Sequence, residues 1–165
     1  MSTQFALNRT LNAAILTISD TRTEQTDKGG FLISQLLEQA SVDVKEKLIC
    51  KDEIMDIQEI LNRWTKSNEI DVIITTGGTG IAKRDCTIEA IQPSFTKEIM
   101  AFGELFRFLS FTEDVGTRAM LSRAVAGVVN DKAVFVLPGS VGAIQLAMNK
   151  LILPELEHIV FELTK

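Results

Sequence analysis

The chain has 165 residues, of which 45% are hydrophobic and 24% are charged, and its formal net charge is −5. This length suits one domain with a substantial core. The acidic balance, without any Lys/Arg run, argues against a nucleic-acid or membrane-binding surface. No apolar run approaches the roughly 18 residues of a transmembrane helix, and residues 1–12 are too polar for a signal peptide. We therefore expect a cytoplasmic protein with a polar leader at residues 1–12 and a single domain at residues 13–165.

The first half of the chain alternates predicted strands with predicted helices. Apolar runs that end in polar loops are typical of buried parallel strands, and apolar residues at spacings of three and four indicate helices. The second predicted strand alternates apolar and charged residues only at its start, which favours a position near the sheet edge. We expect strands at residues 13–19, 42–49 and 71–75, helices opening at Gly29 and Ile54, and a short helix capped by Thr87.

The second half contains an aromatic stripe and a hairpin. Phe102, Leu105, Phe106 and Leu109 recur at helical spacing, which indicates core packing or a contact between subunits. Two apolar runs around Asn130 and Asp131 predict a β-hairpin. Other helical segments are predicted at residues 117–123, along the stripe Ile144, Ala147, Met148 and Leu151, and from Pro154 at the first position of a final helix.

Four polar loops, at residues 19–28, 50–53, 76–87 and 138–140, each follow a predicted strand. The alternation of strands and helices predicts an α/β fold with a mostly parallel sheet. Because the carboxyl ends of parallel strands meet at one sheet edge, the four loops are expected to converge on a binding crevice.

The loop at residues 76–80 has the composition of a phosphate cradle. Its three glycines allow close backbone approach to a ligand, and its two threonines add hydroxyl groups. A tight turn that needs glycine only for its geometry is the alternative. Lys28, Lys83, Arg84 and Arg123 could also reach this crevice.

Three carboxylates, Asp20, Asp52 and Asp85, are expected beside the phosphate loops. Carboxylates beside a bound phosphate repel it unless a cation such as Mg²⁺ bridges them. The sequence therefore predicts a phosphate or pyrophosphate ligand bound with Mg²⁺. Each Asp taken alone also fits a helix cap or a solvated loop charge.

Other nucleotide and metal sites are not supported by the sequence. Neither G-x-G-x-x-G nor a Walker loop is present. A flavodoxin-like electron carrier remains an alternative, although the absence of Tyr and the single Trp leave little to sandwich a flavin. Cys50 and Cys86 are too few and too widely spaced for a zinc site, so two free thiols are expected. The lone His158 excludes a multi-histidine centre.

Five motifs together give a specific resemblance. They span most of residues 13–160 in a consistent order, and the chain resembles the MoaB/MogA family of molybdenum cofactor biosynthesis. The motifs are Thr17-Ile-Ser-Asp-Thr-Arg22, Thr75-Thr-Gly-Gly-Thr-Gly-Ile-Ala-Lys-Arg-Asp85, Phe102-Gly-Glu-Leu-Phe-Arg107, Leu121-Ser-Arg-Ala-Val-Ala-Gly127 and Leu137-Pro-Gly-Ser140.

The resemblance implies a three-layer αβα fold with a small β-hairpin in the second half, usually assembled as a homo-oligomer, a trimer or hexamer. It also implies binding of molybdopterin, with ATP as co-substrate, Mg²⁺ as cofactor, and adenylylated molybdopterin and pyrophosphate as products. Asp52 and Asp85 match catalytic, metal-holding aspartates. A catalytically silent molybdopterin carrier is the alternative, and a downstream molybdenum-insertion protein is a possible partner. The residues expected to bind the ligands are Ser19, Asp20, Thr76, Gly77, Gly78, Thr79, Gly80, Ser122, Arg123, Pro138, Gly139 and Ser140.

Two positions depart from the family pattern. Cys86 stands where Val commonly follows the aspartate, and Val141 stands where Pro often follows the serine of the P-G-S turn. A neutral Cys behaves as a small hydrophobic residue, so both departures are expected to be tolerated.

Overall fold

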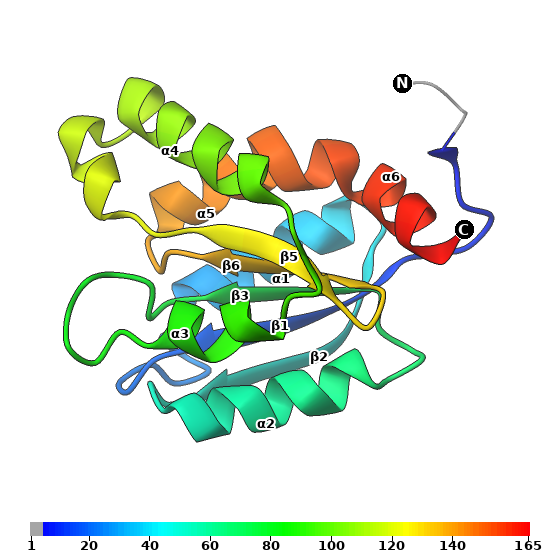
Figure 1. The fold of residues 1–165 in the computed structure, drawn as a ribbon, viewed down its shortest axis with the longest axis horizontal. Helices are drawn as coiled ribbons and strands as arrows, with labels where there is room; N and C mark the ends of the chain where they lie inside the picture. The colour runs from blue at the N-terminus through cyan, green and yellow to red at the C-terminus, as the bar shows by residue number, and fades with distance from the viewer. Residues whose placement is uncertain (1–4) are drawn as a thin grey trace.

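A six-stranded sheet in the order β2-β1-β3-β6-β5-β4 forms the centre of the computed structural model, which describes residues 5–165 (Figure 1). Four neighbouring strands run parallel, whereas β5 is antiparallel to β6 and β4 is antiparallel to β5. The predicted hairpin and the edge position of β2 are therefore confirmed. The strands are β1 (Asn12–Ile18), β2 (Asp43–Cys50), β3 (Val72–Thr76), β4 (Lys97–Glu98), β5 (Val125–Val129) and β6 (Lys132–Leu137).

Helices cover both faces of the sheet and complete the predicted three-layer αβα fold (Figure 1). One face packs against α1, α4, α5 and α6, and the other packs against α2 and α3. Strand β1 is apolar throughout because Ala13 and Ile15 enter the first core while Ala14 and Leu16 enter the second. The helices are α1 (Lys28–Gln39), α2 (Ile54–Thr65), α3 (Thr87–Ile91), α4 (Met100–Glu113), α5 (Val141–Ala147) and α6 (Leu153–Thr164).

Local details differ in part from the predictions. The final helix α6 begins at Leu153 with Pro154 in its first turn, as predicted, but the π-helical segment η4 (Met148–Ile152) joins it to α5 without a break. Proline lacks the N–H that an α-helix requires, and a wider turn accommodates that loss. The helical segment predicted at residues 117–123 is a 3₁₀ helix, η3 (Gly116–Leu121). Thr87 does not cap α3; its hydroxyl instead donates to the Gly77 carbonyl at 2.8 Å and ties the glycine loop to that helix.

The described part of the predicted leader packs against the amino end of the sheet and against α6. Phe5 stacks on His158 with ring centroids 3.8 Å apart. Arg9 forms a two-pronged ion pair with Asp71 at the start of β3, with distances of 2.8 and 2.6 Å. Residues 1–4 of that leader lie outside the described residues. Among residues 5–165, none of the helices combines the length and apolar character that a membrane crossing requires.

Candidate functional site

The four predicted loops converge at one end of the sheet. Register brings the strand ends level, because Thr76 of β3 pairs with Thr17 of β1 on one side and with Leu137 of β6 on the other. Ile18 pairs with Cys50 at the end of β2. The loops after β1, β2, β3 and β6 therefore share an edge, which confirms the expected convergence.

The glycine loop turns sharply directly after β3. Gly77 and Gly78 adopt φ values of 96° and 68°, a backbone region that residues other than glycine rarely adopt. A Cβ on Gly77 would also collide with the carbonyl oxygen of Ile18. The Gly77 N–H donates to the Leu137 carbonyl at 3.0 Å, so the loop is fixed against both neighbouring strands.

A cavity of about 370 Å³ opens on the β1 and β6 side of this loop. A Cβ on Gly29, at the start of α1, would crowd Ile144 Cδ1 at 2.8 Å and would lie 3.7 Å from the Gly139 carbonyl oxygen. The Thr76 hydroxyl donates to the Pro138 carbonyl at 2.9 Å and joins the two loops. The cavity is lined by Thr17, Ile18, Ser19, Arg22, Asp27, Lys28, Gly29, Thr76, Gly77, Gly139, Ser140 and Val141.

Asp27 is a cavity residue that the sequence analysis missed. Its side chain is buried and accepts hydrogen bonds from the Thr17 hydroxyl at 2.7 Å and from the Gly30 N–H at 2.9 Å. It thereby caps α1 and fixes the loop after β1. The sequence signal that could have identified Asp27 as a helix cap is its position directly before the start of the predicted helix, three residues before Gly30.

The second half of the glycine loop faces carboxylates instead of the cavity. Asp52 Oδ1 lies 2.8 Å from the position of a Cβ on Gly78, and Asp85 Oδ2 lies 2.7 Å from that of a Cβ on Gly80. The Asp52 N–H donates to Asp20 Oδ1 at 3.1 Å. Burial and the negative charges of Asp20 and Asp85 raise the pKa of Asp52. We name Asp20, Asp52 and Asp85 the carboxylate edge.

Arg84 neutralises part of the carboxylate edge. Its Nε and Nη2 donate to the two oxygens of Asp20 at 3.0 and 2.9 Å, and its Nη1 donates to Glu53 at 3.0 Å. The hydrogen bonds from Arg84 hold the pKa of Asp20 below its ordinary value. One side chain from the loop after β3 thus connects the loops after β1 and β2.

Arg123 supports the loop from the opposite side. It donates to the carbonyls of Thr79 and Gly80, both at 2.8 Å, and pairs with Glu89 at 2.6 Å. The neighbouring Ser122 ends η3, where its N–H donates to Ala119. Neither Ser122 nor Arg123 lines the 370 Å³ cavity. In this structure Arg123 holds the backbone whose glycines face the carboxylate edge.

The donor set at this edge is compatible with Mg²⁺ bound together with a phosphate ligand. Within residues 5–165, no group of three or more His, Cys, Asp or Glu side chains is placed to hold a metal ion. Mg²⁺ in nucleotide sites is commonly held by one or two carboxylates plus phosphate oxygens and water. Asp52 and Asp85, on either side of the side-chain-free backbone at Gly78 and Gly80, fit such a role.

Cys50 and Cys86 are free thiols, as predicted. Burial, as the leading cause, raises the pKa of Cys50 to about 12. Burial also raises the pKa of Cys86. Because the thiolate is the reactive form, a raised pKa lowers the reactive fraction of both thiols at neutral pH.

Residues 14–158 match the family model described as "Probable molybdopterin binding domain". The chain belongs to the MoaB/MogA family. It is 60% identical over 161 residues to molybdenum cofactor biosynthesis protein B of Staphylococcus aureus, covering 96% of this chain and 95% of that protein.

Solved structures of the family share the whole fold. A crystal structure of molybdenum cofactor biosynthesis protein B has a TM-score of 0.92 and 52% identity, with 96% of this chain and 98% of that chain covered. The tungsten cofactor synthesizing protein MoaB from Pyrococcus furiosus has a TM-score of 0.85 and 36% identity, with 96% and 100% covered. These matches agree with the three-layer fold and with the resemblance carried by the sequence motifs.

Proposed function

We propose that this protein binds molybdopterin and transfers AMP from MgATP to its terminal phosphate, releasing pyrophosphate, as a step of molybdenum cofactor biosynthesis. The supporting observation is the division of the glycine loop between a cavity lined by backbone and hydroxyl groups and an edge lined by carboxylates. The relatives are named for the synthesis of molybdenum and tungsten cofactors. The adenylylated product would then pass to a molybdenum-insertion protein.

The cavity is the proposed site for the molybdopterin phosphate. The first turn of α1 lies at the cavity, and helix N-termini favour anions. Lys28 and Arg22 add positive charge along its rim. Ser19 and Ser140 line the same cavity with hydroxyl groups. This combination neutralises a phosphate without requiring a metal ion in the cavity.

The carboxylate edge is the proposed site for the triphosphate of ATP. Asp52 and Asp85 would hold Mg²⁺, which when bound neutralises charge on the phosphates. An oxygen of the molybdopterin phosphate forms a bond to the α-phosphorus, and the bond to the bridging oxygen breaks as pyrophosphate leaves with its electron pair. Because this nucleophile is already anionic, positioning and charge neutralisation carry the reaction without a general base.

Substituting Asp85→Asn tests the catalytic assignment. The amide oxygen keeps the hydrogen bond that the carboxylate accepts from the Ala82 N–H at 3.0 Å, so the loop is retained while the charge is lost. Pyrophosphate release should fall at least about 100-fold, whereas molybdopterin binding measured by fluorescence should stay near wild type. Asp43→Asn, an exposed position on β2, is the matched control. Unchanged turnover in Asp85→Asn would reject this role for Asp85.

A catalytically silent molybdopterin carrier is the second candidate. It is favoured by the Arg84 ion pair, which occupies both oxygens of Asp20 and leaves fewer free carboxylates for a metal ion. A carrier would bind molybdopterin in the cavity but release no pyrophosphate when ATP and Mg²⁺ are supplied. The wild-type protein in the same assay therefore separates the two functions.

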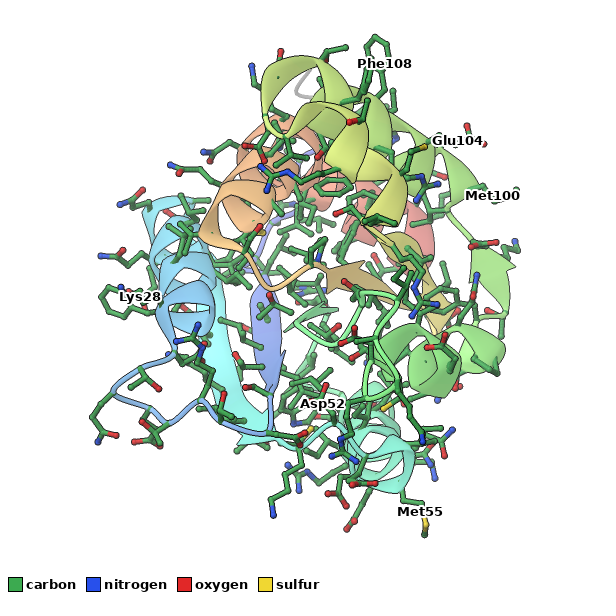
Figure 2. The ribbon with its side chains drawn as sticks, turned by 90° about the vertical axis from the view of Figure 1, so that its left-hand side faces the viewer. Lys28, Asp52, Met55, Met100, Glu104 and Phe108 are labelled. Carbon is green, nitrogen blue, oxygen red and sulfur yellow. The ribbon has the colours of Figure 1, made fainter. Side chains whose placement is uncertain are left out.

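We further propose that the protein assembles with copies of itself through α4 and η3. Of the predicted stripe, Phe102 and Phe106 are buried in the core, but Leu105 is 50% exposed. Figure 2 shows Met100, Glu104 and Phe108 along the outer side of α4, at the opposite end of the molecule from Met55. The outer apolar face consists of Met100, Leu105, Phe108, Phe111, Met120 and Leu121.

The size of this apolar face supports a second copy as its occupant. Six large side chains, each at least half exposed, present on the order of 700 Å² of surface. Patches on typical monomers reach about 300–600 Å², whereas a standard protein interface buries about 800 Å² per partner. A trimer or hexamer, as the family resemblance implies, would cover this surface.

Replacing Phe108 with Glu tests the assembly. A charge at the centre of the apolar face should convert the oligomer to monomer in light scattering coupled to size-exclusion chromatography, because an unpaired charge in an interface is costly. Met55→Glu changes an apolar residue that is even more exposed but lies away from α4, and it should leave the mass unaltered. A wild-type protein that is already monomeric would contradict the proposed assembly.

A further inference from the structure

Arg84 stands at the point where three ligand-binding loops meet. It belongs to the loop after β3, it pairs with Asp20 after β1, and it pairs with Glu53 at the start of α2. The Asp52 N–H donates to the same Asp20 oxygen that accepts from Arg84 Nη2. The Arg84 guanidinium therefore links the three loops that carry the aspartates of the carboxylate edge.

The contacts of Arg84 use both oxygens of Asp20. A divalent cation at Asp52 and Asp85 would lie near Asp20, because the Asp52 N–H donates to Asp20 Oδ1 at 3.1 Å. Two cations drawn to one cluster of carboxylates repel each other. Metal binding and the Arg84–Asp20 pair are therefore in competition.

We propose that Arg84 is the internal counter-ion of the carboxylate edge in the free protein, and that a divalent cation there displaces its guanidinium from Asp20 and frees it to bind the triphosphate. The inference rests on the proposed adenylyl transfer and adds a residue to it. Arg84 then has two successive partners, a carboxylate before metal binding and a phosphate after it.

The surroundings of Arg84 allow this exchange. Its side chain is 56% exposed, so its release buries no charge and opens no core. It borders a second hollow, of about 450 Å³, whose lining also includes Asp52, Glu53 and Lys83. The planar fork of a guanidinium matches two phosphate oxygens as well as it matches two carboxylate oxygens. Glu53 remains as a tether that keeps the freed side chain near the triphosphate.

Binding of Mn²⁺ alone to the ligand-free full-length protein tests the competition. Arg84→Gln should bind Mn²⁺ about three- to fivefold more tightly than Lys83→Gln in titrations followed by electron paramagnetic resonance, which corresponds to the strength of a good exposed ion pair. Both variants lose one positive charge from neighbouring positions, but only Arg84 pairs with Asp20. General electrostatics therefore affect both variants alike.

A second pair of measurements tests the origin of the difference. In an Asp20→Asn background, the advantage of Arg84→Gln over Lys83→Gln should disappear. With Mg²⁺ saturating, Arg84→Gln should weaken ATP binding about tenfold, because a charge-assisted bidentate contact is lost, and Arg84→Lys should restore part of it. Equal Mn²⁺ affinities of Arg84→Gln and Lys83→Gln, or no Mn²⁺ binding by either, would overturn the proposal.

The result is distinguishable from a failure of the proposed function. Wild-type protein that releases pyrophosphate while Arg84→Gln and Lys83→Gln bind Mn²⁺ equally would retain adenylyl transfer and reject the counter-ion role. Wild-type protein that releases no pyrophosphate while the difference in Mn²⁺ affinity is observed would reject adenylyl transfer and retain the competition.

Discussion

The two halves of the glycine loop lie in different surroundings. Thr76 and Gly77 face a cavity lined by hydroxyl groups, by the cations Arg22 and Lys28, and by the Asp27 carboxylate, whose oxygens already accept from Thr17 and Gly30. Gly78 and Gly80 face Asp52 and Asp85. Neutral dipoles and cations accept an anion directly, whereas carboxylates accept one only through a bridging cation. A stretch of five residues thereby separates the proposed molybdopterin phosphate site from the proposed metal-dependent site.

The two halves also differ in how they are held. The cavity half is fixed by strand register and by backbone collisions that exclude a side chain at Gly77. The edge half is held by the Arg123 side chain on the carbonyls of Thr79 and Gly80 and by the Thr87 N–H on the Gly78 carbonyl. We therefore expect substitutions in the first half to affect folding, and substitutions around the second half to affect turnover more than folding.

The largest expected effect is that of Gly77→Ala. The new Cβ would collide with the Ile18 carbonyl and would also impose a φ of 96° on alanine. We expect a loss of about 2–4 kcal/mol of stability, measured by denaturant unfolding, together with loss of molybdopterin binding.

Gly116→Ala is the matched control for Gly77→Ala. Its φ of 63° is also positive, but nothing lies within 4 Å of the added Cβ. Only the backbone strain remains, which costs about 1 kcal/mol. Equal losses in the two variants would show that the contact with Ile18 does not hold the cavity half in place.

An intermediate effect is expected for Arg123→Gln. The variant loses the two hydrogen bonds to the Thr79 and Gly80 carbonyls, and stability should fall by about 1–2 kcal/mol. Pyrophosphate release should fall about tenfold or more, because the backbone beside Asp85 is no longer positioned, while molybdopterin affinity should change little. Glu89→Gln keeps the carbonyl contacts and should resemble wild type. A larger loss in binding than in turnover would remove the distinction between the two halves.

The smallest effect on the site is expected at the opposite end of the sheet. Asp71 lies at the amino end of β3, where its side chain is 12% exposed and accepts bonds from Arg9 and from the Asn12 N–H. Partial burial would raise the pKa of Asp71, but these hydrogen bonds outweigh it and hold the pKa below its ordinary value. Asp71→Asn should therefore cost about 1 kcal/mol at neutral pH without changing turnover.

The pH dependence of that cost follows from the direction of the shift. An acid with a lowered pKa in the folded state contributes stability above its unfolded pKa and loses it as the pH falls through the folded pKa. The difference between wild type and Asp71→Asn should be largest at neutral pH and vanish in strong acid, in urea titrations at several pH values. A difference that grows in acid would contradict this ion pair.

Local patterns were sufficient for most of the fold. The apolar runs of β1 and β3 and the helical spacing along α2 are properties of neighbouring residues, so strand and helix positions follow from the sequence. The same reasoning missed the π-helical join at residues 148–152 and placed a cap at Thr87. Both depend on what packs against the segment, which propensity does not report.

Only part of the candidate site could be predicted from such local sequence patterns. Parallel strands impose a common edge, so the convergence of the loops could be predicted from their order along the chain. Asp27 was missed because its hydrogen bond to Thr17 joins residues on a strand and a helix cap. Arg84 and Arg123 were both expected near the crevice, but sequence could not separate a cation that pairs with Asp20 from one that binds loop carbonyls.

The sequence by itself determined the α/β class and the set of loops at the binding edge, because these follow from periodicity and strand order. Its contiguous motifs carried the family resemblance, which implied the three-layer αβα fold. The tertiary structure alone decided that the glycine loop divides between a cavity and a carboxylate edge, and which carboxylates Arg84 neutralises. Those outcomes depend on contacts between residues far apart in the sequence, such as Asp20 with Asp52, 32 positions away, and with Arg84, 64 positions away. Only the folded register of the sheet sets such contacts.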